Sequence, residues 1–259
     1  MKQKNLLAAL SAATTLTFAV NAHAYLTFFG EDLNNSASVP LSSTPNASSA
    51  ETSFKSFLFS VGTETFESQT TGADAPLGLT FPGYGGGTLS ATLSGSGTVA
   101  SVTPGATNGF GRYSIPSATS AKFWEVQAGG NGSFIIDFGQ SIAALGFYGI
   151  DIGDFGGQLT VSLSNGSTHT VNNTIGSGGS TDGSVLYYGL IAENAGEEFT
   201  SISFNTTTGQ GDVFAFDNFT IGSQEQVCRE GCNVPEPVTL SLFGLGLVGL
   251  AATRRRKIV

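Results

Sequence analysis

Residues 157–171 read G-Q-L-T-V-S-L-S-N-G-S-T-H-T-V and contain two short strands joined by a turn. Leu159, Val161 and Leu163 occupy every second position, which is the period of a β-strand with one buried face. Asn165-Gly166 is a strong hairpin turn signal, and a second short strand follows it. The polar positions hold serine and threonine instead of charged residues. This pattern predicts a hairpin with one face on a protein core.

Strand-like segments recur along the chain, separated by turns rich in glycine, serine and asparagine. They cover residues 54–59, 88–93, 98–102, 121–126, 134–138, 142–152, 184–191, 199–204 and 212–221. The S-G-S-G run at 94–97 gives its two flanking segments the spacing of a hairpin. No stretch between the two termini has a convincing helical period. We therefore predict an all-β fold, a β-sandwich of jelly-roll type, and the lack of an internal repeat disfavours a solenoid or propeller.

The chain divides into five parts by composition. They are a signal peptide (1–24), an irregular N-terminal arm (25–50), the β-sandwich (51–223), a linker (224–233) and a C-terminal membrane segment (234–259). The linker contains Cys228 and Cys232, for which a local disulfide is the default in an exported chain. A zinc site would need further ligands, and the only histidine after residue 24 is the distant His169.

The N-terminus has the three regions of a secretory signal peptide. Lys2 and Lys4 precede a mostly apolar run at residues 6–20, and the chain then reads A-H-A up to Ala24. Small residues at this spacing predict cleavage between Ala24 and Tyr25. The protein is therefore expected to be exported.

The C-terminus has three features in strict order. Pro235, Glu236 and Pro237 precede an uncharged apolar run at residues 238–252, which the cationic residues Arg254, Arg255, Arg256 and Lys257 follow. The run is shorter than the roughly 20 residues of a usual spanning helix, but it can span where the bilayer thins and the cations reach the interface. Cations next to a span stay in the cytoplasm, which places the preceding domain across the membrane. The alternative is a buried terminal helix of a soluble domain.

This order of Pro-Glu-Pro, short apolar helix and arginine cluster resembles the PEP-CTERM sorting signal of Gram-negative bacteria. The matching positions are Pro235, Glu236, Pro237, the run 238–252 and Arg254, Arg255 and Arg256. The resemblance implies a precursor that is anchored in the inner membrane, where a membrane-embedded exosortase recognises and cleaves it. The protein is then delivered to the cell surface or extracellular matrix. The family context also implies an association with exopolysaccharide and biofilm. The resemblance covers about a tenth of the chain and leaves the role of the rest open.

The charge of the exported part is strongly acidic. All 19 acidic residues lie between positions 25 and 236, against Lys55, Arg112, Lys122 and Arg229, which gives a net charge of about −15. Such a surface argues against nucleic acid and anionic lipid, because both attract cations. It is compatible with the binding of divalent cations or neutral glycans. The alternative is that the charge only keeps an extracellular protein soluble.

A possible calcium site is suggested by aspartates in a chain otherwise poor in charge. The candidate ligands are Asp151, Asp154, Asp212 and Asp217. Calcium takes six to eight oxygen ligands from carboxylates, amides and backbone carbonyls of flexible loops. The alternative is that the first two make turn hydrogen bonds and that Asp217 binds the backbone of a neighbouring strand.

The sequence contains no recognisable catalytic motif. We find no G-x-S-x-G elbow, no H-E-x-x-H pair and no cysteine–histidine pair. The sequence does not exclude a pair of catalytic carboxylates on distant strands. The leading hypothesis is a non-enzymatic exported surface or matrix protein. The second is a carbohydrate-binding module, with calcium as a possible cofactor, in which exposed aromatic residues such as Trp124 and Tyr148 stack on sugar rings. A polysaccharide-degrading enzyme is the third.

Overall fold

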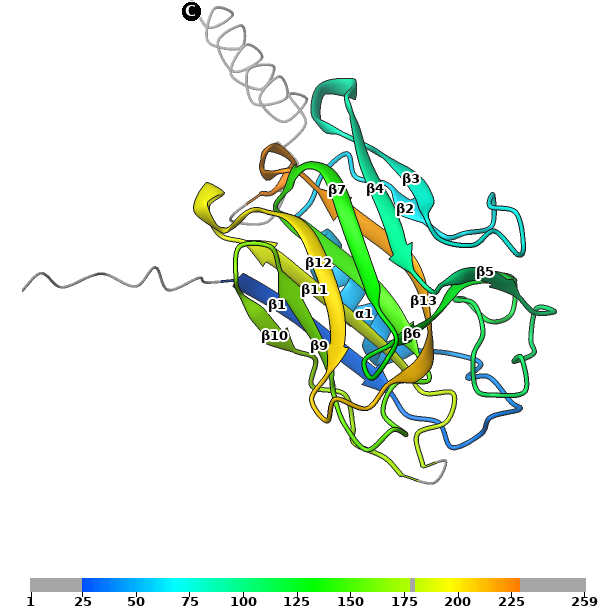
Figure 1. Ribbon diagram of the computed structural model, residues 1–259. Coiled ribbons are helices and arrows are strands. Elements are labelled where there is room, and N and C mark those ends of the chain that lie inside the picture. The colour runs from blue at the N-terminus through cyan, green and yellow to red at the C-terminus, as the bar shows by residue number, and fades with distance from the viewer. Residues whose placement is uncertain (1–24, 178–179, 229–259) are drawn as a thin grey trace, which may run out of the picture.

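A computed structural model describes residues 25–177 and 180–228, which fold into two antiparallel β-sheets packed face to face (Figure 1). The first sheet has the order β1 (Tyr25–Asp32), β11 (Val185–Ala192), β8 (Ala144–Ile150), β13 (Asp212–Gly222), β6 (Lys122–Ala128) and β5 (Thr98–Ser101), with β2 (Thr63–Glu64) paired to β13. The second has the order β10 (Thr168–Thr170), β9 (Leu159–Leu163), β12 (Phe199–Thr206), β7 (Phe134–Ile142), β4 (Thr88–Gly95) and β3 (Leu77–Pro82). The predicted all-β sandwich is confirmed, while its jelly-roll connectivity stays a prediction.

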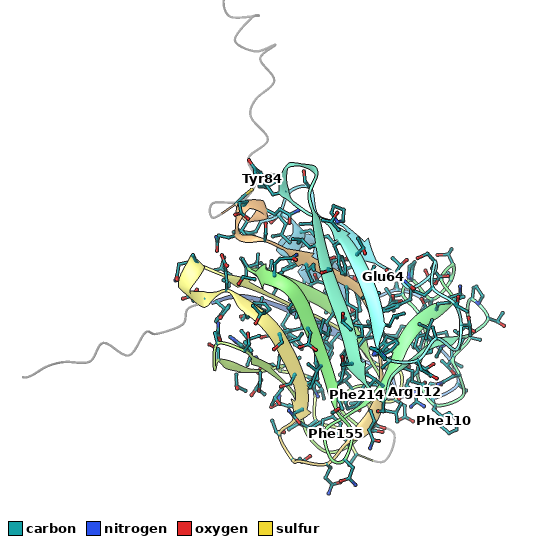
Figure 2. The ribbon with its side chains drawn as sticks, turned by 45° about the horizontal axis from the view of Figure 1, so that its top comes forward. Glu64, Tyr84, Phe110, Arg112, Phe155 and Phe214 are labelled. Atoms are coloured by element: carbon teal, nitrogen blue, oxygen red, sulfur yellow. The ribbon has the colours of Figure 1, made fainter. Side chains whose placement is uncertain are left out.

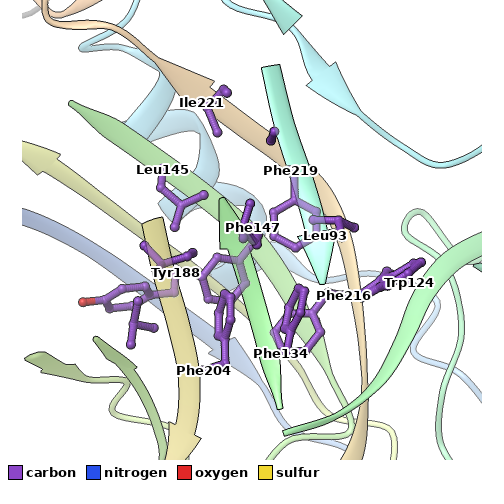
Figure 3. Packing of buried hydrophobic residues seen from close by; sticks show 14 of the residues in the cluster. Leu93, Trp124, Phe134, Leu145, Phe147, Tyr188, Phe204, Phe216, Phe219 and Ile221 are labelled. Carbon is purple, nitrogen blue, oxygen red and sulfur yellow. The ribbon is translucent and has the colours of Figure 1, made fainter. Parts of the chain in front are cut away.

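Aromatic side chains from both sheets fill the core between them (Figure 3). Phe134 of β7 stacks on Phe204 of β12, with ring centroids 4.5 Å apart. Across the sandwich, the ring centroid of Phe134 lies 5.0 Å from that of Phe216 of β13. The ring centroid of Phe204 lies 5.3 Å from that of Phe147 of β8. Each such ring buries about 150–250 Å², so this cluster supplies much of the force that holds the sheets together.

Strands β8 and β11 are buried on both faces, and every residue of each is buried. One face joins the core between the sheets, and the other is covered by helix α1 (Pro45–Lys55). The helix places Phe54 against Tyr187, with ring centroids 5.9 Å apart. Double burial explains why these strands lack the alternation of polar and apolar residues that marks β9.

The prediction of an irregular arm at residues 25–50 is wrong, because this part contains β1 and most of α1. The helix begins with Pro45 in its first turn, and Ala47, Ala50 and Phe54 form its buried face. Two of these three positions are alanine, which gives only a weak apolar signal. The strand predicted at residues 54–59 is also wrong, since Phe54 lies in the last turn of this helix.

Asp32 links the first strand to the helix. Its carboxylate accepts hydrogen bonds from the backbone N–H groups of Asn46 (3.2 Å) and Ala47 (2.9 Å). The first N–H groups of a helix have no partner within the helix, so a carboxylate there stabilises it. Gly30 of β1 packs against the same turn of the helix, and a Cβ atom added to Gly30 would overlap the carbonyl of Asn46.

The hairpin predicted around the S-G-S-G run is also wrong. Strand β4 belongs to the second sheet and β5 to the first, so the chain crosses between the sheets at this point. A Cβ atom on Gly97 would overlap the ring of Trp124, which explains the glycine there. The sequence analysis also missed β3, in which Leu79 and Phe81 are buried at alternate positions.

Three terminal predictions fall on residues outside the described ranges. They are the signal peptide at 1–24, the membrane segment at 234–259 and the second cysteine, Cys232. Within residues 25–177 and 180–228, no helix is both long and apolar enough to span a membrane.

The contact between Gly30 and α1 can be tested by substitution. Gly30→Ala should lower the free energy of unfolding by about 1–3 kcal/mol, because the added methyl group pushes the helix off β1. Gly78→Ala in β3 is the matched control, since a Cβ atom there would have no neighbour within 4 Å. Urea unfolding followed by circular dichroism measures both. Equal stability of the two variants would contradict this account of the helix packing.

Candidate functional site

Three aspartates meet at one end of the sandwich. Carboxylate oxygens of Asp151, Asp154 and Asp182 lie within 4.8 Å of one another. The topology explains this meeting, because β8 lies between β11 and β13 and runs antiparallel to both. The chain leaving β8 therefore emerges where the chains entering β11 and β13 arrive. Asp212, the first residue of β13, also lies next to Asp154.

Asp151 is the buried member of this acidic cluster. Its backbone has a φ of 66°, which is the left-handed region, and the residue is 5% exposed. Its Oδ1 accepts a hydrogen bond from the Gly183 N–H (2.9 Å), and its Oδ2 lies 3.4 Å from Nη1 of Arg112. Burial raises the pKa of Asp151 to about 6, although these two contacts oppose the rise.

Asp154 has no such support. Its Oδ1 is buried and has no hydrogen-bond partner in the described part of the chain. Burial, followed by the neighbouring carboxyl of Asp212 and the charges of Asp151 and Asp182, raises its pKa to about 7. Carboxylates held this close repel one another, and a hard cation among them would remove the repulsion and supply the missing partner.

Arg112 places a positive charge beside Asp151, on one side of the acidic cluster. Its Nε lies 2.7 Å from Oε2 of Glu125, and its Nη1 also donates to the carbonyl of Val213 (3.3 Å). The guanidinium lies over the ring of Phe110, 5.5 Å from the ring centroid. Arg112 therefore holds Asp151 in place and leaves Asp154, Asp182 and Asp212 as the more exposed members.

The sequence analysis named three of these four aspartates and missed Asp182 and Arg112. Asp182 lies in a T-D-G turn within a stretch rich in glycine and serine, which predicted only a loop. Arg112 is one of four cations in an acidic region, and this scarcity was the only available signal.

Asp217 lies apart from the cluster. It is fully buried, and its Oδ2 accepts hydrogen bonds from the Ser114 hydroxyl and the Ile115 N–H, both at 2.8 Å. Burial raises its pKa well above the usual value. Its carboxylate holds the loop before β6 against the first sheet, so the prediction of Asp217 as a calcium ligand is wrong. Its role is structural, as the alternative proposed, but its partners lie in a loop and not in a neighbouring strand.

The two aromatic residues expected to stack on glycans are both buried. Trp124 is 0% exposed and packs on Phe66 with ring centroids 6.3 Å apart, while Tyr148 is 1% exposed. The Tyr148 hydroxyl donates to Oε2 of Glu51 at 2.8 Å, beneath α1. A ring inside the core cannot meet a sugar, so the prediction of stacking by Trp124 and Tyr148 is wrong.

Other aromatic residues are exposed, at opposite ends of the molecule (Figure 2). Tyr84 is 57% exposed and Phe110 is 68% exposed. His169, the only histidine after the predicted cleavage site, is half-buried beside the ring of Tyr25, with centroids 4.8 Å apart. The Tyr25 hydroxyl donates to the carbonyl of Glu197 (2.6 Å), so this histidine borders a structural contact at the edge of the sandwich.

The end of the described chain is fixed to the domain and is not a free linker from residue 224. The turn η3 (Gln224–Gln226) begins with a capping box formed by Ser223 and Gln226. The Gln226 side chain is fully buried, and Cys228 donates its N–H to the carbonyl of Phe57 at 2.8 Å. Residues 224–228 of the predicted linker therefore belong to the domain. The pairing of Cys228 with Cys232 stays a prediction.

Comparisons with solved structures find domains of low similarity. The K2 adhesin domain of Lys-gingipain is 17% identical, with a TM-score of 0.38, and covers 62% of this chain and 97% of that one. The K1 adhesin domain of the Porphyromonas gingivalis enzyme is 13% identical, with a TM-score of 0.33 and coverages of 64% and 99%. A family 11 carbohydrate-binding module of a Clostridium thermocellum cellulase is 12% identical, with a TM-score of 0.29 and coverages of 64% and 96%. At these scores the likeness carries no information about a ligand.

No curated protein matches the chain. The family model of the PEP-CTERM protein-sorting motif matches residues 233–257. This match confirms the resemblance drawn from the Pro-Glu-Pro segment, the apolar run and the arginine cluster. The motif implies recognition by an exosortase and an exported, envelope-associated protein. The chain therefore carries a PEP-CTERM protein-sorting motif at its C-terminus.

Proposed function

We propose that the chain is a non-enzymatic surface protein whose β-sandwich is carried across the inner membrane and held there by residues 238–252. An exosortase then cleaves near Pro235–Pro237 and delivers the domain to the cell surface or matrix, where it associates with exopolysaccharide. The observation that carries this proposal is the sorting motif at residues 233–257. The fold supports it, because the last described strand, β13, ends at Gly222, before the motif begins.

Carbohydrate binding is the alternative, and the described residues support it less than the sequence did. Stacking on glycans needs aromatic rings on an open face. Tyr113, Tyr148, Tyr187, Tyr188 and Trp124 are all buried, whereas Tyr84 is 57% exposed. Glycan association through the Ser- and Thr-rich strand surfaces stays part of the proposal.

The acidic cluster has two possible uses. Retaining glycosidases place two carboxyl groups about 5 Å apart, so hydrolysis deserves a direct assay. However, Asp151 is already bound by Arg112 and Gly183, its carboxylate converges with those of Asp154 and Asp182, and Asp212 lies next to Asp154. Converging carboxylates fit a hard cation better, so we favour a calcium site formed by Asp154, Asp182 and Asp212 beside Asp151.

Sorting can be tested by processing in cells. The full chain, tagged after Ala24, should lose everything beyond the Pro-Glu-Pro segment only in a host that contains an exosortase. The mass of the C-terminal peptide reports the cleavage. A variant with alanine at Pro235, Glu236 and Pro237 keeps the apolar run and the cations, and it should stay uncleaved. An intact tail in both hosts would mean that residues 238–252 form a permanent anchor.

Calcium binding can be tested by thermal unfolding. Saturation to about 100 times Kd stabilises a folded protein by about 2.7 kcal/mol, which should raise the Tm by about 5–10 °C over the value in chelator. Asp154→Asn should remove most of this rise. Asp137→Asn is the matched control, because Asp137 is exposed on β7. An equal Tm in calcium and chelator for the unaltered protein would exclude the site.

The cluster should also make the protein less stable as pH rises when no metal is present. The pKa of Asp154 is about 7 in the folded protein and near 3.8 when exposed, so the folded state holds more protons across this range. In chelator, its contribution to stability should therefore fall between pH 4 and pH 7. Asp154→Asn should flatten that part of the Tm profile. A profile that is the same in both proteins would contradict the assigned pKa.

A further inference from the structure

Two exposed aromatic rings meet at the end of the sandwich opposite Phe110. Tyr84 is 57% exposed and Phe59 is 37% exposed, and their rings pack edge to face with centroids 6.0 Å apart. Figure 2 shows Tyr84 at one extreme of the molecule and Phe110 near the other. Isolated exposed apolar residues are ordinary, but a pair of rings in contact with each other and with solvent suggests a binding surface.

This aromatic pair lies beside the last described residues of the chain, up to Cys228. The Phe59 N–H donates to the carbonyl of Gln226 at 3.1 Å, and Leu58 forms a β-bridge with Val227. The Gln226 Nε2 also donates to the carbonyl of Pro82 at 3.2 Å, two residues before Tyr84. The end of the described chain and the two rings therefore belong to one set of contacts.

The length of chain beyond this exit brings the rings close to the membrane. Val238, where the apolar run begins, lies ten positions after Cys228, and a chain of this length can span at most about 36 Å. A disulfide between Cys228 and Cys232 would shorten the reach further, because it holds their Cα atoms about 4.4–6.8 Å apart. As long as residues 238–252 lie in a bilayer, this end of the sandwich stays within that reach of its surface, whereas the opposite end can lie further away.

The chemistry of this end fits a neutral membrane interface. Tyrosine is enriched at membrane–water interfaces, where its ring is half apolar and its hydroxyl is wet. Tyr84 lies in a turn with Gly85 and Gly86, at which an added Cβ atom would meet nothing within 4 Å, so the turn projects into open space. The exposed Glu225 of η3 adds negative charge and disfavours anionic lipid.

We infer that Tyr84 and Phe59 form a contact surface for zwitterionic lipid headgroups while the precursor is held by its C-terminal segment. The inference rests on the proposed anchoring. Two rings bind a bilayer weakly on their own, but the tether raises their effective concentration at the surface to about the millimolar range. The contact orients the sandwich with its acidic cluster and Phe110 directed away from the membrane.

The test uses the full chain in phosphatidylcholine nanodiscs, with or without bromine on the acyl chains. Tyr84→Trp and Phe110→Trp introduce matched reporters at the two ends, and the buried Trp124 gives both the same background. Brominated lipid should reduce the emission of the tryptophan at position 84 by about two-fold, as expected for a ring at the interface. The tryptophan at position 110 should be unaffected. Replacing phosphatidylcholine by phosphatidylglycerol should weaken the quenching at position 84.

The outcomes separate this inference from the anchoring on which it rests. A chain that does not co-elute with the discs refutes the anchoring and the inference together. A chain that co-elutes while both reporters are unquenched refutes the inference alone, as does quenching at position 84 only after exosortase is added. Hydrogen exchange of the unaltered chain gives a second measurement, since the amides of residues 83–87 should exchange more slowly in discs than in detergent.

Discussion

The structure depends on the burial of two neighbouring strands, β8 and β11, on both of their faces. Their inner faces complete the aromatic core between the sheets, and their outer faces require the cover of α1. This need for cover explains why the segment after β1 folds into a helix, although its composition of serine, alanine and asparagine gives a weak signal. The contact between Gly30 and Asn46 and the carboxylate of Asp32 then set the place of the helix.

The same pair of strands also builds the acidic cluster. Since β8 ends where β11 and β13 begin, the loops that carry Asp151, Asp154 and Asp182 have to share one end of the sandwich. The raised pKa values of Asp151 and Asp154 follow from that crowding and burial. The lipid-facing end inferred for Tyr84 is the opposite one. The molecule therefore separates a charged end from an aromatic end that lies beside the last described residues of the chain.

Much of the fold could be predicted from the sequence where strands have one buried face, as in β7 and β9. Prediction failed where burial came from small residues, as in α1, and where the chain changed sheets, as between β4 and β5. Three cluster aspartates could be named because charge is scarce in this chain. Asp182 could not, because only the pairing of β8 with β11 shows which loop lies beside Asp154. Trp124 was misjudged because the sequence does not show that it packs against Phe66 inside the core.

The pairing of β1 with β11 has a consequence for export. The partner residues of β1 lie more than 150 positions further along the chain, as in the pairing of Tyr25 with Ala192. A chain that crosses a membrane from its N-terminus therefore exposes β1 long before its partner arrives, and contacts between distant segments form slowly. The central strand β13 ends at Gly222, just before the sorting motif at 233–257. The sandwich can thus close only when translocation is nearly complete, so that folding and arrival of the sorting motif at the membrane coincide in time.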